Sequence, residues 1–573
     1  MKITLAQHSG FCMGVRNAIL RIVSEINDSE EEILVYGPLI HNPQTIDVLH
    51  RRGMRTITSL DPIDGKRVVI RTHGVPVGDN RLLKKRAGAV INLTCPRVAR
   101  VQSIIKKYSA RNLHTIITGD RDHAEVTGLM SYASSGVTVI SDVRDVDDVP
   151  PAEAYLLVSQ TTFDRKLFTT IVSRIRERFA DVTVFDTICD STRYRQDDVF
   201  KAISGGIDTL VVVGGKNSAN TKRLAQIGRD NNIRTFHVET EAELVEENFA
   251  DSKSVLVTAG TSTPGWIINN VLERLYSINF KKSNFFINAG MTFLELIVRT
   301  NILASAAAFF ITLITFRLAG IPVSYELGAI SFLYIFSMYS VNNYFERDLL
   351  RLSNPYKYAV YGRYGSVFLG VSILLMAISI IISTRFGPAT TALIAGSYSL
   401  GFIYSTKPVK GLVAKIRLRF TRKLYNSKLV TCFGWIIISV LAPMTLGAPS
   451  LAAFIAISGF VFALIFLRTA LMDLIAFQGD LILGRETLPI MVGTRIMQTL
   501  SMIVAAAGIA LFSVFILVMG DWRFLFLSLN IIYYVILLLV INRLNYLIAL
   551  KYEMLVDLNF ALLIIIYALV QII

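Results

Sequence analysis

The hydropathy of the chain changes near residue 290, and no other feature of the sequence constrains the fold as strongly. The residues that follow contain about nine apolar runs, most of them long enough to span a bilayer as an α-helix. These runs lie at 294–316, 325–341, 365–384, 389–405, 429–448, 452–472, 497–519, 522–541 and 554–572. The sequence therefore predicts an all-α polytopic membrane domain of about nine transmembrane helices over residues 294–573.

The distribution of basic residues predicts how this domain is oriented. Residues 291–573 hold 21 Lys and Arg against 10 Asp and Glu, and most of the basic residues fall after the second, fourth, sixth and eighth spans. Basic loops stay on the cytoplasmic side of a membrane and can contact anionic lipid there. We therefore expect a multi-pass protein of the cell (inner) membrane, in contact with the lipid bilayer. Its preceding soluble half should face the cytoplasm.

The first 280 residues have the pattern of a soluble α/β domain. Helical patterns alternate with β-branched runs, which is typical of largely parallel sheets; the runs lie at 33–36, 67–71, 114–118, 137–140, 155–159, 182–185, 209–213 and 254–257. The first 290 residues hold 37 Lys and Arg against 33 Asp and Glu, and we expect no nucleic-acid partner. A helix over 266–277 leads to a juxtamembrane linker over 281–293, so the predicted domains are 1–280 and 294–573.

Three cysteines in the first half, Cys12, Cys95 and Cys189, follow one another at intervals of 83 and 94 residues. Three thiolates from distant segments can hold three irons of a [4Fe–4S] cluster and leave the fourth iron open to a substrate. Zinc is the other metal that three cysteines could bind. Zinc sites, however, favour closely spaced cysteine pairs, and this spacing offers none. The even spacing predicts an α/β domain of three lobes around one central iron–sulfur site.

Polar residues in the loops after the predicted strands complete a candidate site. His41, His73 and His123 fall in three separate loops, where their rings could donate hydrogen bonds to an anionic substrate. Glu125 follows two residues after His123 and could donate protons if burial raises its pKa. The segments 214–221 and 258–264, rich in Gly, Ser and Thr, follow two further strands. Their backbone N–H groups and hydroxyls could cradle phosphate oxygens.

The motifs of this half match those of a known family in order. The matching blocks are 10–15 (Gly-Phe-Cys-Met-Gly-Val), 40–43, 71–75, 94–96, 123–125, 160–162, 186–189, 195–196, 217–221 and 261–264. On these blocks the first 265 or so residues resemble 4-hydroxy-3-methylbut-2-enyl diphosphate reductase, the last enzyme of the methylerythritol phosphate route to isoprenoids.

This resemblance implies reductive dehydroxylation of an allylic diphosphate to isopentenyl and dimethylallyl diphosphate, with reduced ferredoxin or flavodoxin as the electron donor. It implies that Cys12, Cys95 and Cys189 hold the cluster and that Glu125 supplies protons with the help of His123 and Thr161. An alternative hypothesis makes the cluster domain a redox or metabolite sensor. The residues that would bind or orient the substrate are His41, His73, His123, Thr161, Thr192, Ser218, Asn220 and Ser262.

The second half resembles the UbiA-like intramembrane prenyltransferases, which bind Mg²⁺ and a prenyl diphosphate through two loops rich in Asn and Asp. Both loops depart from the family pattern, because Ala476 and Leu350 stand where that pattern has carboxylates. The resemblance implies transfer of a prenyl group. The alternative is that this half is a degenerate anchor or a lipid-binding module. The residues left to bind Mg²⁺ and diphosphate are Asn342, Glu346, Asp473 and Asp480.

Overall fold

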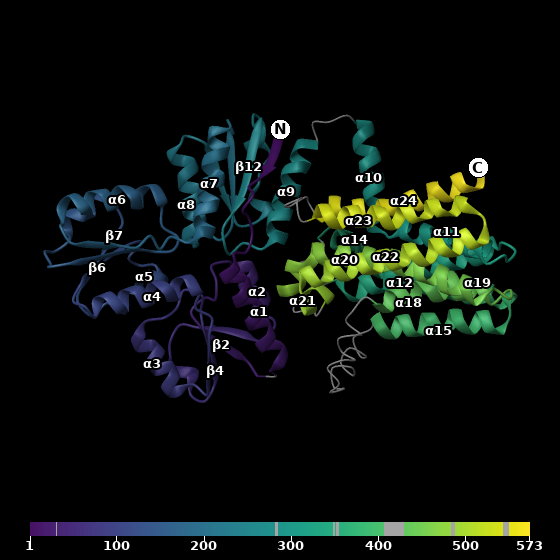
Figure 1. Cartoon of the computed structure of the whole chain (residues 1–573), viewed down its shortest axis with the longest axis horizontal. Helices are drawn as coiled ribbons and strands as arrows, with labels where there is room; N and C mark the ends of the chain where they lie inside the picture. The colour runs from purple at the N-terminus through teal and green to yellow at the C-terminus, as the bar shows by residue number, and fades with distance from the viewer. Residues whose placement is uncertain are drawn as a thin grey trace. The chain divides into compact units, whose positions relative to one another are not determined.

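The structure is a computed structural model that describes residues 1–29, 31–280, 285–347, 350, 355–405, 429–482, 487–541 and 549–572 (Figure 1). The chain divides into two compact units, Met1–Lys282 and Ser283–Ile573. In the described part of the chain, all strands belong to the first unit and the second unit is helical. The expected order, an α/β half followed by an all-α half, is therefore confirmed.

The first unit contains three sheets of four parallel strands. The first sheet has the order β3 (Met54–Ile57), β2 (Ile33–Tyr36), β4 (Arg67–Ile70), β5 (Ala89–Asn92). The second has the order β7 (Val137–Ile140), β6 (His114–Thr118), β8 (Tyr155–Ser159), β9 (Val182–Val184). The third has the order β1 (Lys2–Leu5), β12 (Ser254–Ala259), β10 (Thr209–Val213), β11 (Arg234–Val238).

All three sheets have the same topology. Numbered along the chain within each sheet, the strands lie in the order 2-1-3-4, with β1 counted as the fourth strand of the third sheet. The first and third strands therefore lie side by side in the middle: β2 beside β4, β6 beside β8, and β10 beside β12. In open parallel sheets, ligands bind beyond the carboxyl ends of such a pair. We call each sheet with its helices a lobe.

Helices connect the strands of each lobe. Every residue of β8 and of β10 is buried, as expected for strands that are covered on both faces. The helices of this unit are α1 (Met13–Asp28), α2 (Pro43–His50), α3 (Val77–Arg86), α4 (Pro96–Ser109), α5 (Ala124–Met130), α6 (Arg165–Arg178), α7 (Asp190–Ser204), α8 (Ala219–Asp230) and α9 (Gly265–Phe280).

The predicted strands of the first unit agree with the structure to within two residues, and the predicted helix over 266–277 is α9. The prediction missed β3, β5 and β11. All three are edge strands and carry polar residues such as Arg55, Asn92 and Arg234. An edge strand has one side open to solvent or loops and tolerates such residues, so a search for apolar runs overlooks it.

The second unit is a bundle of helices (Figure 1). Its helices are α10 (Phe285–Arg299), α11 (Ile302–Leu318), α12 (Tyr325–Phe345), α14 (Pro355–Ser383), α15 (Pro388–Ser405), α18 (Leu429–Ile436), α19 (Ala442–Met444), α20 (Leu451–Ile482), α21 (Leu488–Val492), α22 (Thr494–Met519), α23 (Ser528–Ile541) and α24 (Ala549–Ile572).

Among the described residues, five helices are long and apolar enough to cross a membrane: 360–386, 451–477, 494–519, 522–540 and 552–572. A sixth results if Phe293–Arg299 and Ile302–Leu318, which meet at a 69° bend, form one span. The prediction of nine spans is therefore not confirmed. Helices α12 and α15 carry many Ser, Thr, Tyr and Gly residues, and Leu429–Met444 is short, so these segments are weaker candidates.

A π-helical turn, Ile437–Leu441, joins α18 to α19 in the core of this unit. Pro443 has no N–H to bond to the carbonyl of Ser439, which an α-helix would require four residues earlier. The hydroxyl of Thr315 on α11 donates to that carbonyl instead, at 2.8 Å. Ser331 on α12 bonds the neighbouring carbonyl of Ile438 at 3.3 Å. The freed backbone groups are thus satisfied by side chains of adjacent helices, as a membrane interior demands.

An ion pair joins α20 to α24 inside the bundle. The guanidinium of Arg468 donates to both carboxylate oxygens of Asp557, at 2.7 and 3.2 Å, and both side chains are almost completely buried. Removing one partner of a buried pair leaves an uncompensated charge, which costs about 3–5 kcal/mol, whereas apolar replacement of both partners is often neutral.

We therefore expect Arg468→Leu to lower the thermal unfolding midpoint of the full chain in detergent sharply. The double variant Arg468→Leu/Asp557→Leu should recover most of the loss. Equal midpoints for the single and the double variant would show that the uncompensated Asp557 charge is not the cause.

Candidate active site

The three cysteines occupy equivalent positions in the three lobes. Each follows the fourth strand of its sheet and caps the next helix: Cys12 caps α1, Cys95 caps α4 and Cys189 caps α7. The backbone N–H of Val15 donates to Cys12 Sγ at 3.5 Å. Free N–H groups and the helix dipole stabilise negative charge at a helix N-terminus, so all three positions favour thiolates.

The same hydrogen bond anchors each cysteine. The N–H of Cys12 donates to the carbonyl of Thr261 at 3.0 Å. The N–H groups of Cys95 and Cys189 donate to the carbonyls of Thr72 and Thr161, both at 2.9 Å. Each threonine follows the third strand of its lobe. In every lobe, the loop that carries the cysteine is thus hydrogen-bonded to the loop that follows the third strand, at the carboxyl end of the central strands.

Two of the three cysteine sulfurs lie close to Gly14. A β-carbon added at Gly14, in the first turn of α1, would lie 2.7 Å from Cys95 Sγ and 3.9 Å from Cys12 Sγ. Burial raises the pKa of the Cys95 and Cys189 thiols, and a charge on Cys12 raises both further, while backbone N–H groups oppose these effects. Three soft sulfur donors from three separate segments, each at a helix N-terminus, fit a [4Fe–4S] cluster with one open iron.

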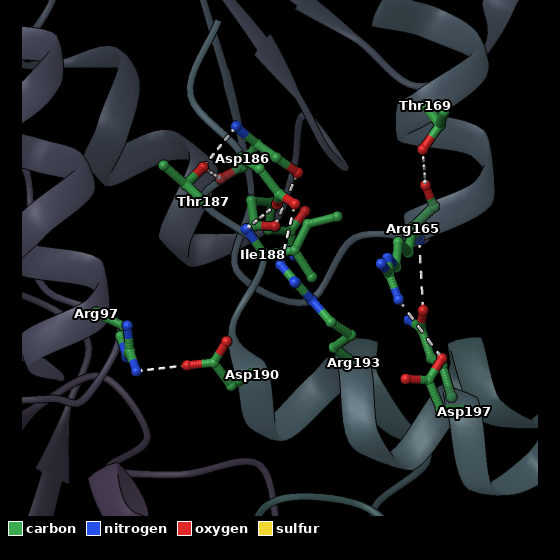
Figure 2. A network of polar contacts seen from close by, with 12 residues as sticks. Arg97, Arg165, Thr169, Asp186, Thr187, Ile188, Asp190, Arg193 and Asp197 are labelled. Carbon is green, nitrogen blue, oxygen red and sulfur yellow. Dashed lines mark hydrogen bonds and ion pairs between the residues drawn. The ribbon is translucent and has the colours of Figure 1, made fainter.

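Two ion pairs lie beside Cys95 and Cys189, and one of them joins two cysteine helices (Figure 2). Arg97, two residues after Cys95, donates to Asp190, the residue after Cys189, at 2.6 Å. This pair joins the first turn of α4 to the first turn of α7. Arg193 on α7 pairs with Asp186 at 3.0 Å, in the loop before Cys189. Figure 2 shows both pairs.

A second group of residues forms a pocket, with an empty volume of about 360 Å³ that includes open solvent at its mouth. The rings of His41, His73 and His123 meet there, with centroid distances of 4.6, 5.8 and 5.5 Å. They come from the loops after β2, β4 and β6, so two lobes supply them. The pocket is lined by Val15, Ile40, His41, Thr72, His73, His123, Glu125, Thr162, Ser218, Ala219, Asn220, Thr261 and Ser262.

The charges near these histidines favour an anionic ligand. Burial lowers the pKa of His41 and His123, the latter to about 4, and the charges of Arg71 and Lys222 lower both further. The pKa of His73 also lies well below its usual value because of burial and the other two histidines. The imidazole nitrogens lie within 4.8 Å of one another and could hold a metal ion. The two neighbouring cations, however, favour an anion over a metal cation.

Several buried polar atoms of the site have no hydrogen-bond partner. They are His41 Nε2, His73 Nδ1, Thr192 Oγ1 and both amide atoms of Asn220. Buried polar groups are almost always bonded in native proteins, so orphaned groups of this kind point to a missing ligand. Ser218 caps α8, whose first-turn N–H groups add donors to the same pocket.

Glu125 and Thr161 form a buried pair next to the pocket. One carboxylate oxygen of Glu125 accepts from Thr161 N–H at 2.7 Å, and the other accepts from the Thr161 hydroxyl at 2.9 Å. Glu125 is 2% exposed, and burial raises its pKa although both bonds from Thr161 lower it. A carboxyl group that keeps its proton nearer to neutral pH suits a proton donor.

Most of the predicted residues of the first half therefore lie together. His41, His73, His123, Glu125, Ser218, Asn220 and Ser262 line the pocket, whereas Thr161 and Thr192 do not. The prediction did not single out Thr72, Thr162 and Thr261, which also line it, or the charges of Arg71 and Lys222. All but Lys222 stand inside the quoted motif blocks, so each block should have been treated as a unit.

Arg195 has a role that the sequence did not reveal. Its guanidinium is 4% exposed and donates to the carbonyl of Gly10 before Cys12, to Ser191 after Cys189, and to the carbonyl of Ala259 before Thr261. One side chain of α7 thus bonds the loop before Cys12, one pocket loop and the first turn of its own helix. A charged side chain with several backbone acceptors can be recognised only after the loops are placed in space.

The predicted residues of the second half lie on two helices. Asn342 is in the last turn of α12 and Glu346 ends that helix, both half-buried. Asp473 and Asp480 are buried on α20, with exposures of 2% and 1%. The basic loop over 406–428 and the segment 483–486 lie outside the described residues.

Comparison with known proteins identifies the first half. Residues 3–276 match the family model described as LytB protein. The 4-hydroxy-3-methylbut-2-enyl diphosphate reductase of Geobacter sulfurreducens is 37% identical over 282 residues, which cover 49% of this chain and 99% of the relative. The chain belongs to the LytB family. The reductase of Nitratidesulfovibrio vulgaris is 39% identical, with 48% of this chain and 100% of the relative covered. LytB proteins of this kind are oxidoreductases, and the chain is an enzyme of that class.

Solved structures are similar to parts of the chain. The reductase of Plasmodium falciparum is 25% identical, with a TM-score of 0.45, and the match covers 48% of this chain and 87% of that one. A UbiA homolog from Archaeoglobus fulgidus, solved bound to GPP and Mg²⁺, is 17% identical, with a TM-score of 0.34. That match covers 48% of this chain and 99% of the other.

The space at Gly14 provides a test of the LytB cysteine site. We expect Gly14→Ala to weaken iron binding about 10- to 100-fold, because the added methyl would displace Cys95 Sγ. Iron and sulfide per chain, with the visible absorbance of the cluster, measure the effect. Gly78→Ala is the matched control, since Gly78 is also the second residue of its helix and has open space around it. Equal iron content in the two variants would contradict a cluster at this point.

Proposed function

We propose that the first half of the chain reduces 4-hydroxy-3-methylbut-2-enyl diphosphate. Two electrons and two protons convert this substrate to isopentenyl or dimethylallyl diphosphate and water. The observation that carries the proposal is the pocket in which orphaned donors, two cations and a buried carboxyl group meet beside three cysteine-capped helices. Membership of the LytB family supports the same reaction.

In this proposal Cys12, Cys95 and Cys189 hold a [4Fe–4S] cluster, which supplies the electrons and a Lewis-acidic open iron when bound. His41, His73 and Asn220 donate to the diphosphate, because their buried polar atoms lack partners. His123 lines the same pocket and donates to the diphosphate as well. Ser218, Ser262 and Thr192 orient it. A diphosphate raises the pKa of the three neutral histidines by its negative charge, so binding the substrate takes up protons.

Glu125, which lines the pocket, supplies the protons, and the hydroxyl of Thr161 assists it through a hydrogen bond to its carboxylate. The first proton goes to the substrate hydroxyl, which departs as water. The second goes to either end of the allylic carbon unit, which accounts for two products. His123 also faces the pocket and accepts from Glu125 N–H at 3.2 Å, so it helps to position the proton donor.

We expect Glu125→Gln to lower kcat about 10²- to 10⁴-fold, the usual contribution of a general acid, while the bound cluster keeps its absorbance. The measurement is anaerobic turnover of the reconstituted full chain with a chemical reductant. Thr161→Ser, which retains the hydroxyl, should lose much less activity than Thr161→Val. An intact cluster that binds the diphosphate without turnover would contradict the reductase and favour a redox or metabolite sensor.

We further propose that the chain has a reductase domain over 1–280, a juxtamembrane linker over 281–293 and a prenyltransferase domain over 294–573. The second domain would lie in the inner membrane, with the first in the cytoplasm. Reduced ferredoxin or flavodoxin would be the electron donor. Apolar helices of membrane-spanning length support the membrane location. Basic loops after the even spans support the orientation.

In the second domain, Mg²⁺ held by Asn342, Glu346, Asp473 and Asp480 would bind a prenyl diphosphate for transfer to an acceptor. Carboxylate and amide oxygens are suitable Mg²⁺ ligands, and Asp473 and Asp480 stand two turns apart on α20. Ala476 and Leu350 weaken the site, because each removes a carboxylate from the pattern. A degenerate anchor or lipid-binding module is the competing function for this half.

Binding of geranylgeranyl diphosphate to the detergent-solubilised chain distinguishes these functions. A prenyltransferase should bind it in Mg²⁺ but not in EDTA, and Asp473→Asn/Asp480→Asn should weaken binding at least about 10-fold through the lost ligands. Asp521→Asn, in a loop where Asp521 pairs with Arg523, is the control. Absence of Mg²⁺-dependent binding in the native chain, and its appearance in Asn343→Asp/Leu350→Asp, would instead identify a degenerate anchor.

A further inference from the structure

The first turns of the three cysteine helices carry an exposed surface that the proposed reaction does not use. We call it the cysteine-helix surface, and it combines two exposed apolar side chains with four arginines. Met13 is 59% exposed and Tyr194 is 49% exposed, although each stands within five residues of a cysteine. The residues of this surface are Met13, Arg16, Arg97, Arg100, Arg193 and Tyr194.

Contacts between the helices bring their N-terminal ends together. Gly14 of α1 faces Cys95 at the start of α4, and Arg97 of α4 pairs with Asp190 of α7. Arg195 on α7 donates to the carbonyl of Gly10, just before α1. Each of the three helices therefore contacts the other two at its N-terminal end. Their exposed first-turn residues consequently lie around the sulfur site.

The charge of this surface is positive. Helix α4 contains no acidic residue, and the first acidic residue of α1 is Glu25, four turns from Cys12. Asp186 and Asp190, the acidic residues beside Cys189, are both paired with arginines. Arg16 and Arg100 are exposed and form no ion pair with any carboxylate in the described residues. Two arginines are thus free to meet an acidic partner.

We propose that the cysteine-helix surface docks an acidic, one-electron carrier protein. This inference rests on the proposed reductase function and names where its electrons enter. All the substrate residues except Thr192 follow the first or third strand of a sheet, whereas this surface belongs to the helices after the fourth strands. Carrier and substrate can therefore bind together. Two carrier molecules, each oxidised by one electron, reduce one bound substrate.

The composition of the surface suits a short-lived encounter with an electron carrier. Electron-transfer complexes are small and short-lived, with interfaces below about 1,200 Å², and a few exposed apolar residues ringed by charge suffice. Complementary charge mainly raises the rate of encounter. The arginines therefore affect the rate with a protein carrier and not the rate with a small chemical reductant.

The test is charge reversal, Arg16→Glu/Arg100→Glu, in the reconstituted full chain. With reduced ferredoxin or flavodoxin as the donor, we expect kcat/KM for the carrier to fall about 10- to 100-fold at low salt. The difference from the native chain should shrink near 1 M salt, where the Debye length is only about 3 Å. With reduced methyl viologen as the donor, turnover should be unchanged. Neither arginine lines the pocket, and the bond of Arg16 to Cys12 is a backbone hydrogen bond of 2.9 Å that a side-chain substitution leaves in place.

The matched control is Arg176→Glu/Arg234→Glu, which reverses two exposed arginines on α6 and β11. Equal carrier kinetics in the two double variants would overturn the docking proposal. A loss of turnover that appears with methyl viologen in anionic vesicles and disappears in detergent would also overturn the docking proposal, since that pattern identifies a lipid-binding surface. Absence of turnover by the native chain with methyl viologen would instead contradict the reductase itself, so the two failures can be told apart.

Discussion

The first half of the chain depends on three helix N-termini that carry cysteines and contact one another. Helix dipoles arranged in this way repel, and the exposed N–H groups need acceptors. Cysteine at each N-cap meets both demands when its sulfur is negatively charged. Burial, however, raises the pKa of the Cys95 and Cys189 thiols, so the thiolates need a positive partner at the centre. A bound metal centre is such a partner, and it would join the three lobes at the same time.

The shared topology explains why the pocket and the cysteines are adjacent but distinct. In every lobe the loops after the first and third strands meet at the sheet centre, and these loops carry the histidines, Glu125, Thr161, Ser218 and Ser262. The cysteine follows the fourth strand, at one edge. A single bond, from cysteine N–H to a threonine carbonyl, then connects the two kinds of loop in each lobe. Triplication of one sheet pattern thus produces both sites.

The sequence predicted the parts of this arrangement that leave a local pattern. Buried strands such as β8 appear as apolar runs, and Cys12, His41 and Glu125 stand in short motifs. The prediction missed edge strands such as β11, because their polar residues interrupt the apolar run that identifies a strand. The bonds of Arg195 to Gly10 and Ala259, and those of the three threonine carbonyls, escaped because they join residues from about 20 to 250 positions apart. In the second half, polar residues that pair between helices lowered the hydropathy of predicted spans, so helices were easier to predict than membrane crossings.

Thr161 links the two parts of the proposed reaction, because it bonds both to the proposed proton donor and to a cysteine of the proposed cluster site. Its N–H and hydroxyl both bond to the Glu125 carboxylate, and its carbonyl accepts from the N–H of Cys189. All the polar groups of one residue are therefore committed to the proton donor on one side and to a cluster cysteine on the other. Because bonded dipoles polarise one another at low dielectric, a change of charge at the sulfur site is felt at the carboxyl group. Reduction, which adds negative charge near Cys189, would then raise the pKa of Glu125 and favour the protonated form that the reaction consumes.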